Sequence, residues 1–410
     1  MKLLHTADWH LGKRLGDYTR LAEQKEVLEE ICEIAEREQV DAVLIAGDLF
    51  DTFNPGNEAV ELFYKTVHRL ADDGCRAVIA IAGNHDSPDR VEAPDPLARE
   101  LGIIFHGKPS TQILPFETRK GLKLLQADEG YVALQLPDYP YPLRLLLVPY
   151  ANEVLLRQYL GTEDKEEALR SVLKKSWQQL ANQYCDEKGV NLMMAHLYFM
   201  QKGGEAPEEP DDEKPILHMG GAQAIFTEDL PQQLQYVTLG HLHRYQHVEG
   251  GPCPAIYSSS PLEYSFSEAH QQKFVVLIEA EPAKPVNTTK LPLQKGRKLV
   301  RKTFSGKEEA VSWLRENPDT FVELTFVSDT YIESETKRAF YDAHDGIVSI
   351  IPELNIQPQQ EKKTKVNLQQ DIRFLFKDYF AHKKGQQPSD ELMDLFNEIL
   401  EIDEDEEEKK

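Results

Sequence analysis

Short, nearly uninterrupted apolar runs alternate with helical stripes in the first quarter of the chain, and this alternation constrains the fold most strongly. The strand-like runs occupy residues 3–4, 42–45 and 78–81. Between them, apolar side chains recur at helical spacing at positions 27, 28, 31, 34 and 35, and again at 59, 60, 63, 67 and 70. Strands that are apolar on both faces are typical of parallel sheets covered by helices. The order predicts a β-α-β-α-β unit and therefore an α/β domain.

The pattern changes in the middle of the chain. Residues 122–150 are strand-like but are interrupted by Gly130 and by prolines 137, 140 and 142, which predicts antiparallel strands of a second sheet. A helix is expected within 152–184. Further strands are expected at 191–195, 235–239, 255–258 and 274–279.

The last third of the chain predicts smaller units. Prolines 282, 285 and 292 indicate a linker over 281–293. A second α/β domain is expected beyond it, with strands at 299–304, 321–327 and 347–352 and helices at 307–316 and 333–342. Apolar stripes over 368–380 and 392–400 predict two amphipathic helices. Two short helices bury little apolar surface by themselves, so we expect them to dock on another protein surface.

Composition excludes several classes of protein. A chain of 410 residues has room for two or three domains. Its 46 basic and 70 acidic residues give a net charge of −24, which argues against a nucleic-acid binder held by charge alone. The longest apolar run, residues 77–82, is far shorter than the roughly 20 residues of a membrane helix, so we expect a cytoplasmic protein without membrane contact. Four cysteines without a Cys-x-x-Cys pair indicate neither a disulfide framework nor a thiolate zinc site.

Five polar motifs each follow directly on a predicted strand. Carboxyl ends of neighbouring strands converge at one edge of an α/β sheet, so one site could collect all of these motifs. Taken singly, each has an ordinary explanation as a helix cap, a turn or a structural histidine. Their joint occurrence favours a single functional site. The motifs are Asp8-Trp9-His10, Gly47-Asp48-Leu49-Phe50-Asp51, Gly83-Asn84-His85-Asp86, Ala195-His196 and Gly240-His241-Leu242-His243, while His5, His68, His106 and His344 are expected to be structural or on the surface.

The donor set suits a pair of divalent cations. Imidazole nitrogens, carboxylates and one amide oxygen fit Mn²⁺, Fe²⁺ or Zn²⁺ better than Mg²⁺ or Ca²⁺. Two such ions carry +4 and the carboxylates of Asp8 and Asp48 carry −2, so the cluster would be positive and would attract an anion. Two metals about 3.5 to 4 Å apart can activate water and bind a phosphoryl group. The residues alone therefore predict phosphoester hydrolysis.

These motifs together resemble the calcineurin-like metallophosphoesterases, and the segments ADWHLG, GDLFD, AGNHD and LGHLH are similar to the nuclease subunits of bacterial SbcCD complexes. The resemblance in motifs covers residues 1 to about 270. It implies a two-sheet β sandwich core flanked by helices. It also implies domains at 1–280 (nuclease), 285–355 (α/β cap) and 366–400 (helix-loop-helix that binds an ATPase), followed by an acidic tail at 401–410.

The resemblance implies roles for individual residues. Two Mn²⁺ ions would be held, with Mg²⁺ or other divalent ions as weaker substitutes. The first would be bound by Asp8, His10 and His243, the second by Asn84, His196 and His241, and Asp48 would bridge them. His85 would be catalytic, stabilising charge on the scissile phosphate or protonating the leaving oxygen. Asp51 would orient and charge His85; relatives typically carry histidine at that place.

The resemblance also implies substrate and partners. The expected activity is 3′-5′ exonuclease action on duplex DNA and endonuclease action on single strands and hairpins, in DNA replication and recombination. The partners would be an SMC-like ATPase of the SbcC type and a second copy of the chain within a heterotetramer. Two alternatives stay open: a phosphatase or small-molecule phosphodiesterase of the same fold, and a catalytically silent scaffold for the ATPase. A basic run in the cap either contacts phosphates or is simply solvated; it comprises Lys295, Arg297, Lys298, Arg301 and Lys302.

Overall fold

The computed structural model describes residues 1–150, 165–205, 207, 225–354, 375–377, 380, 388, 392, 393 and 396. The chain divides into two compact units, Met1–Glu353 and Leu354–Lys410. The helices and strands whose bounds are given below belong to the first unit, except for the last residue of β20. The predicted helix at 152–184 is described only from residue 165 onward.

A six-stranded sheet forms around the first β-α-β-α-β unit. β1, β4, β5 and β6 are parallel neighbours in that order, and β16 and β17 extend the sheet antiparallel beyond β1. Their bounds are β1 Lys2–Thr6, β4 Ala42–Ala46, β5 Ala77–Ile81, β6 Ile103–His106, β16 Phe274–Glu279 and β17 Asn287–Pro292. The parallel pairing predicted from the apolar runs is confirmed.

A seven-stranded sheet forms the second half of the fold. β7, β8 and β9 are antiparallel neighbours, as predicted for 122–150, whereas β9, β10, β13 and β15 run parallel. β14 closes the far edge. The bounds are β7 Lys123–Asp128, β8 Tyr131–Gln135, β9 Leu143–Val148, β10 Val190–His196, β13 Tyr236–Gly240, β14 Gln246–Val248 and β15 Ala255–Tyr257.

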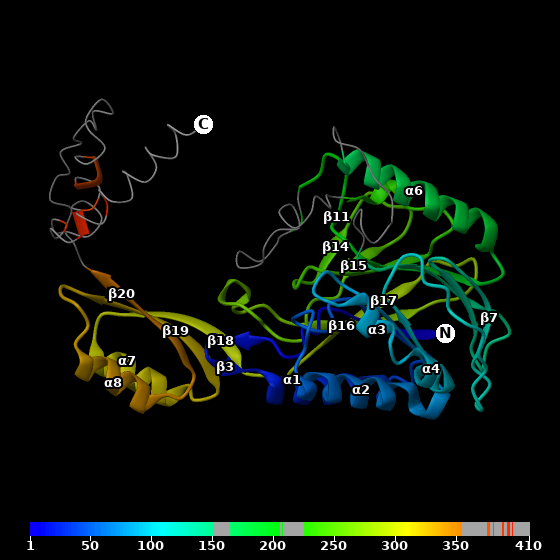
Figure 1. Cartoon of the computed structure of the whole chain (residues 1–410). Helices are drawn as coiled ribbons and strands as arrows, with labels where there is room; N and C mark the ends of the chain where they lie inside the picture. The colour runs from blue at the N-terminus through cyan, green and yellow to red at the C-terminus, as the bar shows by residue number, and fades with distance from the viewer. Residues whose placement is uncertain are drawn as a thin grey trace. The chain divides into compact units, whose positions relative to one another are not determined.

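The two sheets pack face to face and are covered by helices on their outer sides. Alternation along the strands explains this: Leu3 and Leu44 point into a core shared with Leu145 and Leu192 of the other sheet. Their neighbours Leu4, Val43 and Ile45 point outward against α1 Leu21–Arg37 and α2 Asn57–Ala71, which lie along one face in Figure 1. α6 Lys165–Tyr184 covers the outer face of the second sheet. The fold is the expected two-sheet sandwich flanked by helices.

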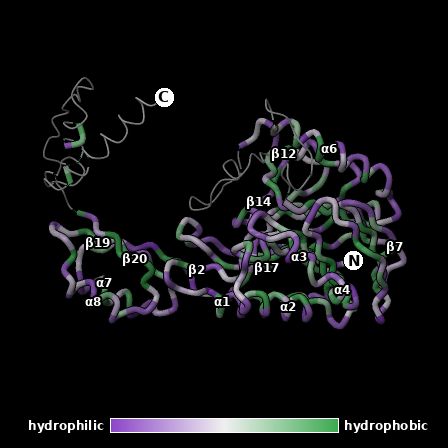
Figure 2. Tube along the Cα trace, in the orientation of Figure 1, coloured by the Kyte–Doolittle hydropathy of each residue, from purple (hydrophilic) through white to green (hydrophobic). Residues whose placement is uncertain are grey.

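The amphipathic character of the covering helices is visible in the chain itself. Green and purple alternate along α1 and α2 in Figure 2, because one side of each helix is buried and the other is solvated. In the described part of the chain, none of the helices combines the length and hydrophobicity of a transmembrane segment.

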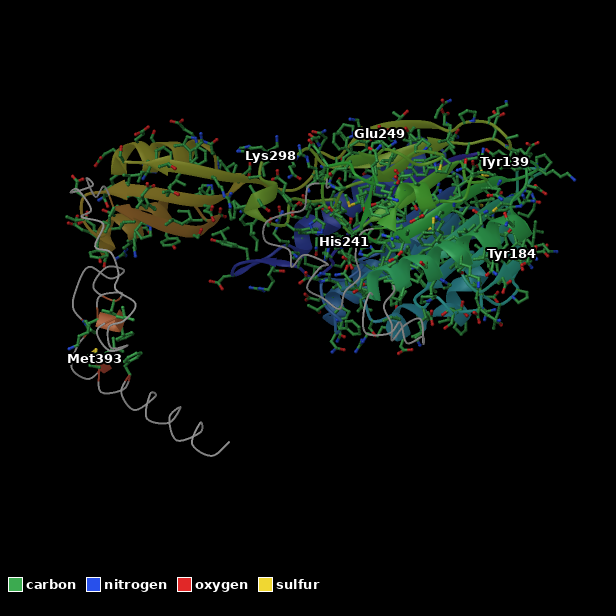
Figure 3. The ribbon with its side chains drawn as sticks, turned by 90° about the horizontal axis from the view of Figure 1, so that it is seen from above. Tyr139, Tyr184, His241, Glu249, Lys298 and Met393 are labelled. Atoms are coloured by element: carbon green, nitrogen blue, oxygen red, sulfur yellow. The ribbon has the colours of Figure 1, made fainter. Side chains whose placement is uncertain are left out.

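A smaller three-stranded sheet follows, with the elements that the sequence predicts. β18 Lys298–Phe304 pairs parallel with β19 Thr320–Ser328, and β20 Ile347–Leu354 completes the sheet. α7 Lys307–Glu316 and α8 Ser334–Ala343 pack on it around Phe340 and Leu324. Lys298, labelled in Figure 3, begins the first strand of this sheet.

The predicted linker at 281–293 is wrong. Residues 287–292 form β17, which pairs with β16 along its whole length, from Phe274 opposite Pro292 to Glu279 opposite Asn287. β17 is an edge strand, and such a strand tolerates a proline because its outward N–H needs no partner. Three prolines in this short stretch therefore indicate the turn and end of a hairpin here.

The predicted helix-loop-helix at 366–400 and the tail at 401–410 lie mostly outside the described residues. Within the second unit, residues 375–377, 380, 392, 393 and 396 are helical. The rings of Phe376 and Phe396 stack at a centroid distance of 4.0 Å, so one residue from each predicted stripe meets the other. The helix pair stays a prediction.

A buried histidine at the end of β6 makes stability depend on pH. His106 is 1% exposed, and neither ring nitrogen has a hydrogen-bond partner among the described residues. Burial lowers the pKa of His106 from its usual 6.5 to about 4. The unfolded chain therefore takes up the proton first, and stability is lost as pH falls from about 6.5 to about 4, by on the order of 3 kcal/mol.

We therefore expect His106→Leu to raise the melting temperature at pH 7 and to flatten its decline toward pH 4. The gain at neutral pH should be about 1 to 3 kcal/mol, the cost of burying unpaired polar atoms. Thermal unfolding across this pH range measures both effects. His68→Ala, an exposed site on α2, is the control. Equal pH dependence in the wild type and His106→Leu would contradict the assignment.

Candidate metal centre

The predicted motifs meet where carboxyl ends of strands from both sheets come together. Asp8 and His10 follow β1, Asp48 follows β4, and Asn84 follows β5 in the six-stranded sheet. From the seven-stranded sheet, His196 ends β10 and the His241–His243 segment follows β13. His241 is labelled within the large α/β part in Figure 3. Ligating groups from far-apart segments thus share one buried place.

The first cluster consists of Asp8, His10 and His243. One potential ligand atom from each lies within 4.8 Å of the others, and all three residues are buried. The Nε2 atoms of His10 and His243 are 2.9 Å apart. Asp8 Oδ1 accepts the backbone N–H of His241 at 2.8 Å, whereas its buried Oδ2 has no hydrogen-bond partner in the described part of the chain.

The second cluster consists of Asp48, His196 and His241, which also have ligand atoms within 4.8 Å of one another. Asn84 joins it: its Oδ1 lies 3.0 Å from His196 Nε2 and 3.2 Å from His241 Nδ1. The donors that the resemblance assigns to the second metal are therefore brought together.

Asp48 lies between the two clusters. Its Oδ2 is 3.5 Å from His10 Nε2 and 3.3 Å from His196 Nε2. Its Oδ1 accepts the backbone N–H of His85 at 2.9 Å, which orients the carboxylate. A carboxylate in this place could bridge two cations.

The electrostatics of the donors fit divalent cations. Burial raises the pKa of Asp8 to about 7, since desolvation outweighs the nearby imidazoles. Burial also opposes ionisation of Asp48, but the imidazoles of His196 and His10 outweigh it and hold the pKa of Asp48 well below its usual range. A buried carboxylate oxygen without a donor and a group of converging imidazoles suit a cation, which compensates the buried negative charge.

The backbone around the centre adopts conformations that most side chains avoid. Asp8, His10 and Asp48 have φ of 55°, 42° and 48°, and His241 has φ of 106°. Such left-handed residues are costly and persist where the surrounding structure enforces them, often at functional sites. The donors are therefore aimed inward by turns at the strand ends.

Glycines make this convergence possible. A Cβ at Gly47 would lie 2.2 Å from His196 Nδ1, and one at Gly240 would lie 1.8 Å from the carbonyl oxygen of Ala46. A Cβ at Gly83 would lie 2.1 Å from Asp48 Oδ1 and 2.3 Å from its backbone nitrogen. In these three motifs the residue before the predicted ligand has to be glycine, because a Cβ there would overlap with neighbouring atoms.

His85 and Asp51 lie beside the first cluster. The rings of His85 and His10 are 4.8 Å apart, edge to face. His85 Nδ1 donates to the backbone carbonyl of Asp51 at 2.8 Å, so Asp51 orients His85 through its main chain. The carboxylate of Asp51 instead lies 3.4 Å from Lys13 Nζ and 3.8 Å from His10 Nδ1. His10, Asp51 and His85 also form a third group with ligand atoms within 4.8 Å.

Asp86 is an important residue to which the sequence analysis gives no role. Its carboxylate accepts backbone N–H groups of Gly83, Leu49 and Phe50 at 2.8, 3.0 and 2.9 Å. Burial raises the pKa of Asp86 to about 6. Asp86 thus connects the loop after β4 with the loop after β5. Its position in the Gly83–Asp86 motif is the sequence feature that could have indicated this role.

Glu268 is a second residue without a predicted role. Its Oε1 lies 3.1 Å from His243 Nδ1, and because a carboxylate only accepts, the imidazole donates there and directs Nε2 toward the cluster. Lys273 forms a buried ion pair with Glu268 and donates to the carbonyl of His243 at 2.7 Å. Burial opposes ionisation of Glu268, but Lys273 and His243 lower its pKa to about 2. No sequence motif links these residues.

We expect Glu268→Gln to weaken metal binding. The variant keeps the shape but loses the charge that fixes the His243 tautomer, and such partners typically contribute about 10- to 100-fold in metal affinity. Titration of Mn²⁺ into chelator-treated protein, followed by calorimetry, measures the change. Glu263→Gln is the matched control, since Glu263 is a buried glutamate that accepts the N–H of Leu299. An unchanged Mn²⁺ affinity of Glu268→Gln would contradict this role.

Comparison with known proteins agrees with this geometry. The profile of the Calcineurin-like phosphoesterase family matches residues 1–245. The SbcD component of the nuclease SbcCD of Bacillus subtilis (strain 168) is 35% identical over 97% of both chains. The corresponding SbcCD component of Rhodobacter capsulatus is 33% identical over 72% of both, and that of Escherichia coli (strain K12) is 27% identical over 82% of this chain and 81% of its own.

The chain belongs to the calcineurin-like phosphoesterases. Within them it belongs to the SbcD family, the nuclease components of SbcCD. Membership implies a hydrolase of phosphodiesters that uses divalent metal ions. The clusters around Asp48 contain the donors for such ions.

Proposed function

We propose that this protein is the Mn²⁺-dependent nuclease component of an SbcCD-type complex. It acts as a 3′-5′ exonuclease on duplex DNA and as an endonuclease on single strands and hairpins, in DNA repair, replication and recombination. The observation that supports it most is the meeting of Asp8, His10, Asp48, Asn84, His196, His241 and His243 at strand ends of both sheets.

We assign the ligands to two ions as the family resemblance implies. Asp8, His10 and His243 would hold one ion, and Asn84, His196 and His241 the other, with Asp48 between them. When bound, the pair of ions supplies positive charge to the phosphate and a reactive water. The protein fixes the donors: the left-handed turns aim them, and Glu268 holds the tautomer of His243.

His85 acts on the substrate. Its Nδ1–H is held by the carbonyl of Asp51, so its Nε2 is the nitrogen that can serve the phosphate. A protonated imidazole there stabilises charge on the phosphoryl oxygens or gives its proton to the leaving oxygen. Asp51 positions His85 through its main-chain carbonyl, and its carboxylate adds negative charge beside His10.

We infer the partners from the family relationship. An SMC-like ATPase of the SbcC type would bind the helices within 366–400, and two copies of this chain would join it in a heterotetramer. The domain at 285–355 would help to select DNA, next to the nuclease domain at 1–280. Such a complex would work on the chromosome, in the cytoplasm.

The test is to assay the purified protein with and without Mn²⁺, alone and with its ATPase partner and ATP. Substrates are labelled duplex, hairpin and single-stranded DNA, with bis(p-nitrophenyl) phosphate beside them. We expect Mn²⁺-dependent cutting of DNA. Hydrolysis of the small diester without cutting of any DNA would instead assign a small-molecule phosphodiesterase. Activity on neither substrate would favour a silent scaffold.

A further inference from the structure

Lys13 is a cation at the rim of the metal centre that neither the motifs nor the proposed roles include. Its backbone N–H donates to the carbonyl of His10 at 2.9 Å, so a tight turn fixes it next to a predicted metal ligand. Its Nζ lies 3.4 Å from Asp51 Oδ1 and 5.9 Å from the ring centre of Tyr264. The side chain is 21% exposed, which leaves the ammonium within reach of a ligand from solvent.

The negative charge of Asp51 accounts for a cation at the position of Lys13. The Asp51 carboxylate, 24% exposed, brings negative charge to the rim of a centre that has to attract phosphate. Lys13 offsets that charge. The contact at 3.4 Å is long for a charge-assisted hydrogen bond, and both side chains are in partial contact with solvent. Because the contact with Asp51 is long, the Lys13 ammonium can leave it and bind a substrate phosphate.

A hollow of about 240 Å³ opens beside Lys13. It is lined by apolar groups of Leu15, Phe266 and Val348, with the hydroxyl-bearing Ser349 on the small sheet. Two glutamates also line it, but both are paired within the protein: Glu268 with Lys273, and Glu323 with Arg301 at 2.7 Å. Among the described lining residues, Lys13 is the one with a positive charge.

The basic run of the cap is engaged elsewhere. Arg301 pairs with Glu323, and Arg297 pairs with Asp345 at 3.4 Å and lies over the ring of Phe321. Lys302 lies over the ring of Trp313. These contacts within the protein argue against a dedicated phosphate-binding role for Arg297, Arg301 and Lys302.

We propose that Lys13 is a substrate-binding residue, whose ammonium contacts the DNA phosphate next to the scissile one while the attached nucleoside occupies the hollow beside Phe266. A lysine serves as a mobile point charge for phosphate, and an apolar wall suits a sugar and base. The inference rests on the proposed nuclease function and names a contact that distinguishes DNA from a small phosphodiester.

The test compares the full-length wild type with Lys13→Ala, Lys13→Arg and Lys123→Ala. Lys123 is a half-exposed lysine that pairs with Glu117 at 3.0 Å on β7, so it controls for loss of one charge. Steady-state kinetics with Mn²⁺ are measured on a short duplex and on bis(p-nitrophenyl) phosphate. Binding to the same duplex without Mn²⁺ is measured by fluorescence anisotropy at several salt concentrations.

For Lys13→Ala we expect the KM for DNA to rise about tenfold, with a smaller change in kcat, and the ratio of kcat/KM on DNA to that on the diester to fall accordingly. The slope of log affinity against log salt should decrease by about one, the signature of one lost phosphate contact. Lys13→Arg should restore most of the affinity, and Lys123→Ala should resemble the wild type.

Two results would overturn the proposal. One is an unchanged KM and salt slope in Lys13→Ala; the other is an equal loss on DNA and on the diester, which would mean a disturbed metal centre. If the wild type neither binds nor cuts DNA, the nuclease function itself fails and the proposal with it. If the wild type cuts DNA and Lys13→Ala equals it, only the role of Lys13 is lost.

Discussion

Replacement of His85 by alanine is expected to reduce DNA cleavage by about 10² to 10⁴, the usual contribution of a group that transfers a proton or stabilises charge at the reacting centre. Mn²⁺ binding should be kept, because both clusters are complete without His85. Single-turnover cleavage of labelled duplex measures the first effect and Mn²⁺ titration the second. Loss of both cleavage and Mn²⁺ binding would instead make His85 a metal ligand, within the group of potential ligands that it forms with His10 and Asp51.

His85→Asn is the informative companion variant. The asparagine amide can still donate to the carbonyl of Asp51, which His85 Nδ1 contacts at 2.8 Å, but it cannot carry a proton to the leaving oxygen. A variant with intact Mn²⁺ binding and the same loss as His85→Ala would indicate that cleavage requires the Nε2 side of the ring, and not only the hydrogen bond to Asp51. Cleavage at the wild-type rate in either variant would refute the assigned role.

Gly83→Ala should abolish Mn²⁺ binding and cleavage together. The new Cβ would lie 2.3 Å from the backbone nitrogen of Asp48 and 2.1 Å from its Oδ1, distances at which the backbone itself has to shift. Displacing Asp48 disturbs the carboxylate between both clusters and the three hydrogen bonds of Asp86 that hold the two loops. We expect no measurable Mn²⁺ binding in calorimetry and a melting temperature several degrees lower.

Gly56→Ala is the matched control for this variant. Gly56 precedes α2 with φ of −65°, and a Cβ there meets nothing within 4 Å. The same added methyl group should therefore leave Mn²⁺ affinity and cleavage unchanged. Wild-type Mn²⁺ binding in Gly83→Ala would show that the loops can rearrange and that the close approach is not required.

The fold could be predicted where burial decides the structure. Strands β1, β4 and β5 are apolar on both faces because one face meets the other sheet and the other meets α1 or α2, so a continuous apolar run identifies them. The three-stranded sheet is predictable for the same reason, because its apolar residues are buried against α7 and α8. The strand at 274–279 is predicted, but its hairpin partner β17 is not, because an exposed edge strand has no apolar pattern and tolerates prolines, so that it resembles a linker.

The site could be predicted as a set of residues but not as a geometry. Motifs at strand ends showed which donors could meet. The hydrogen bond of His85 to the carbonyl of Asp51 was not predictable, since a main-chain contact leaves no trace in residue type. Glu268 and Lys273 lie 25 and 30 residues beyond His243, and only the folded chain brings them to its ring and carbonyl.

Neither sheet of the sandwich holds a full set of donors. Asp8, His10, Asp48 and Asn84 belong to one sheet, and the remaining three imidazoles belong to the other. Bound cations would therefore connect the two sheets. The metal ions would bind only to molecules in which the two sheets are packed in the correct register. A chain whose two sheets have not packed together would then hold no metal ions and would lack the hydrolysis that depends on them.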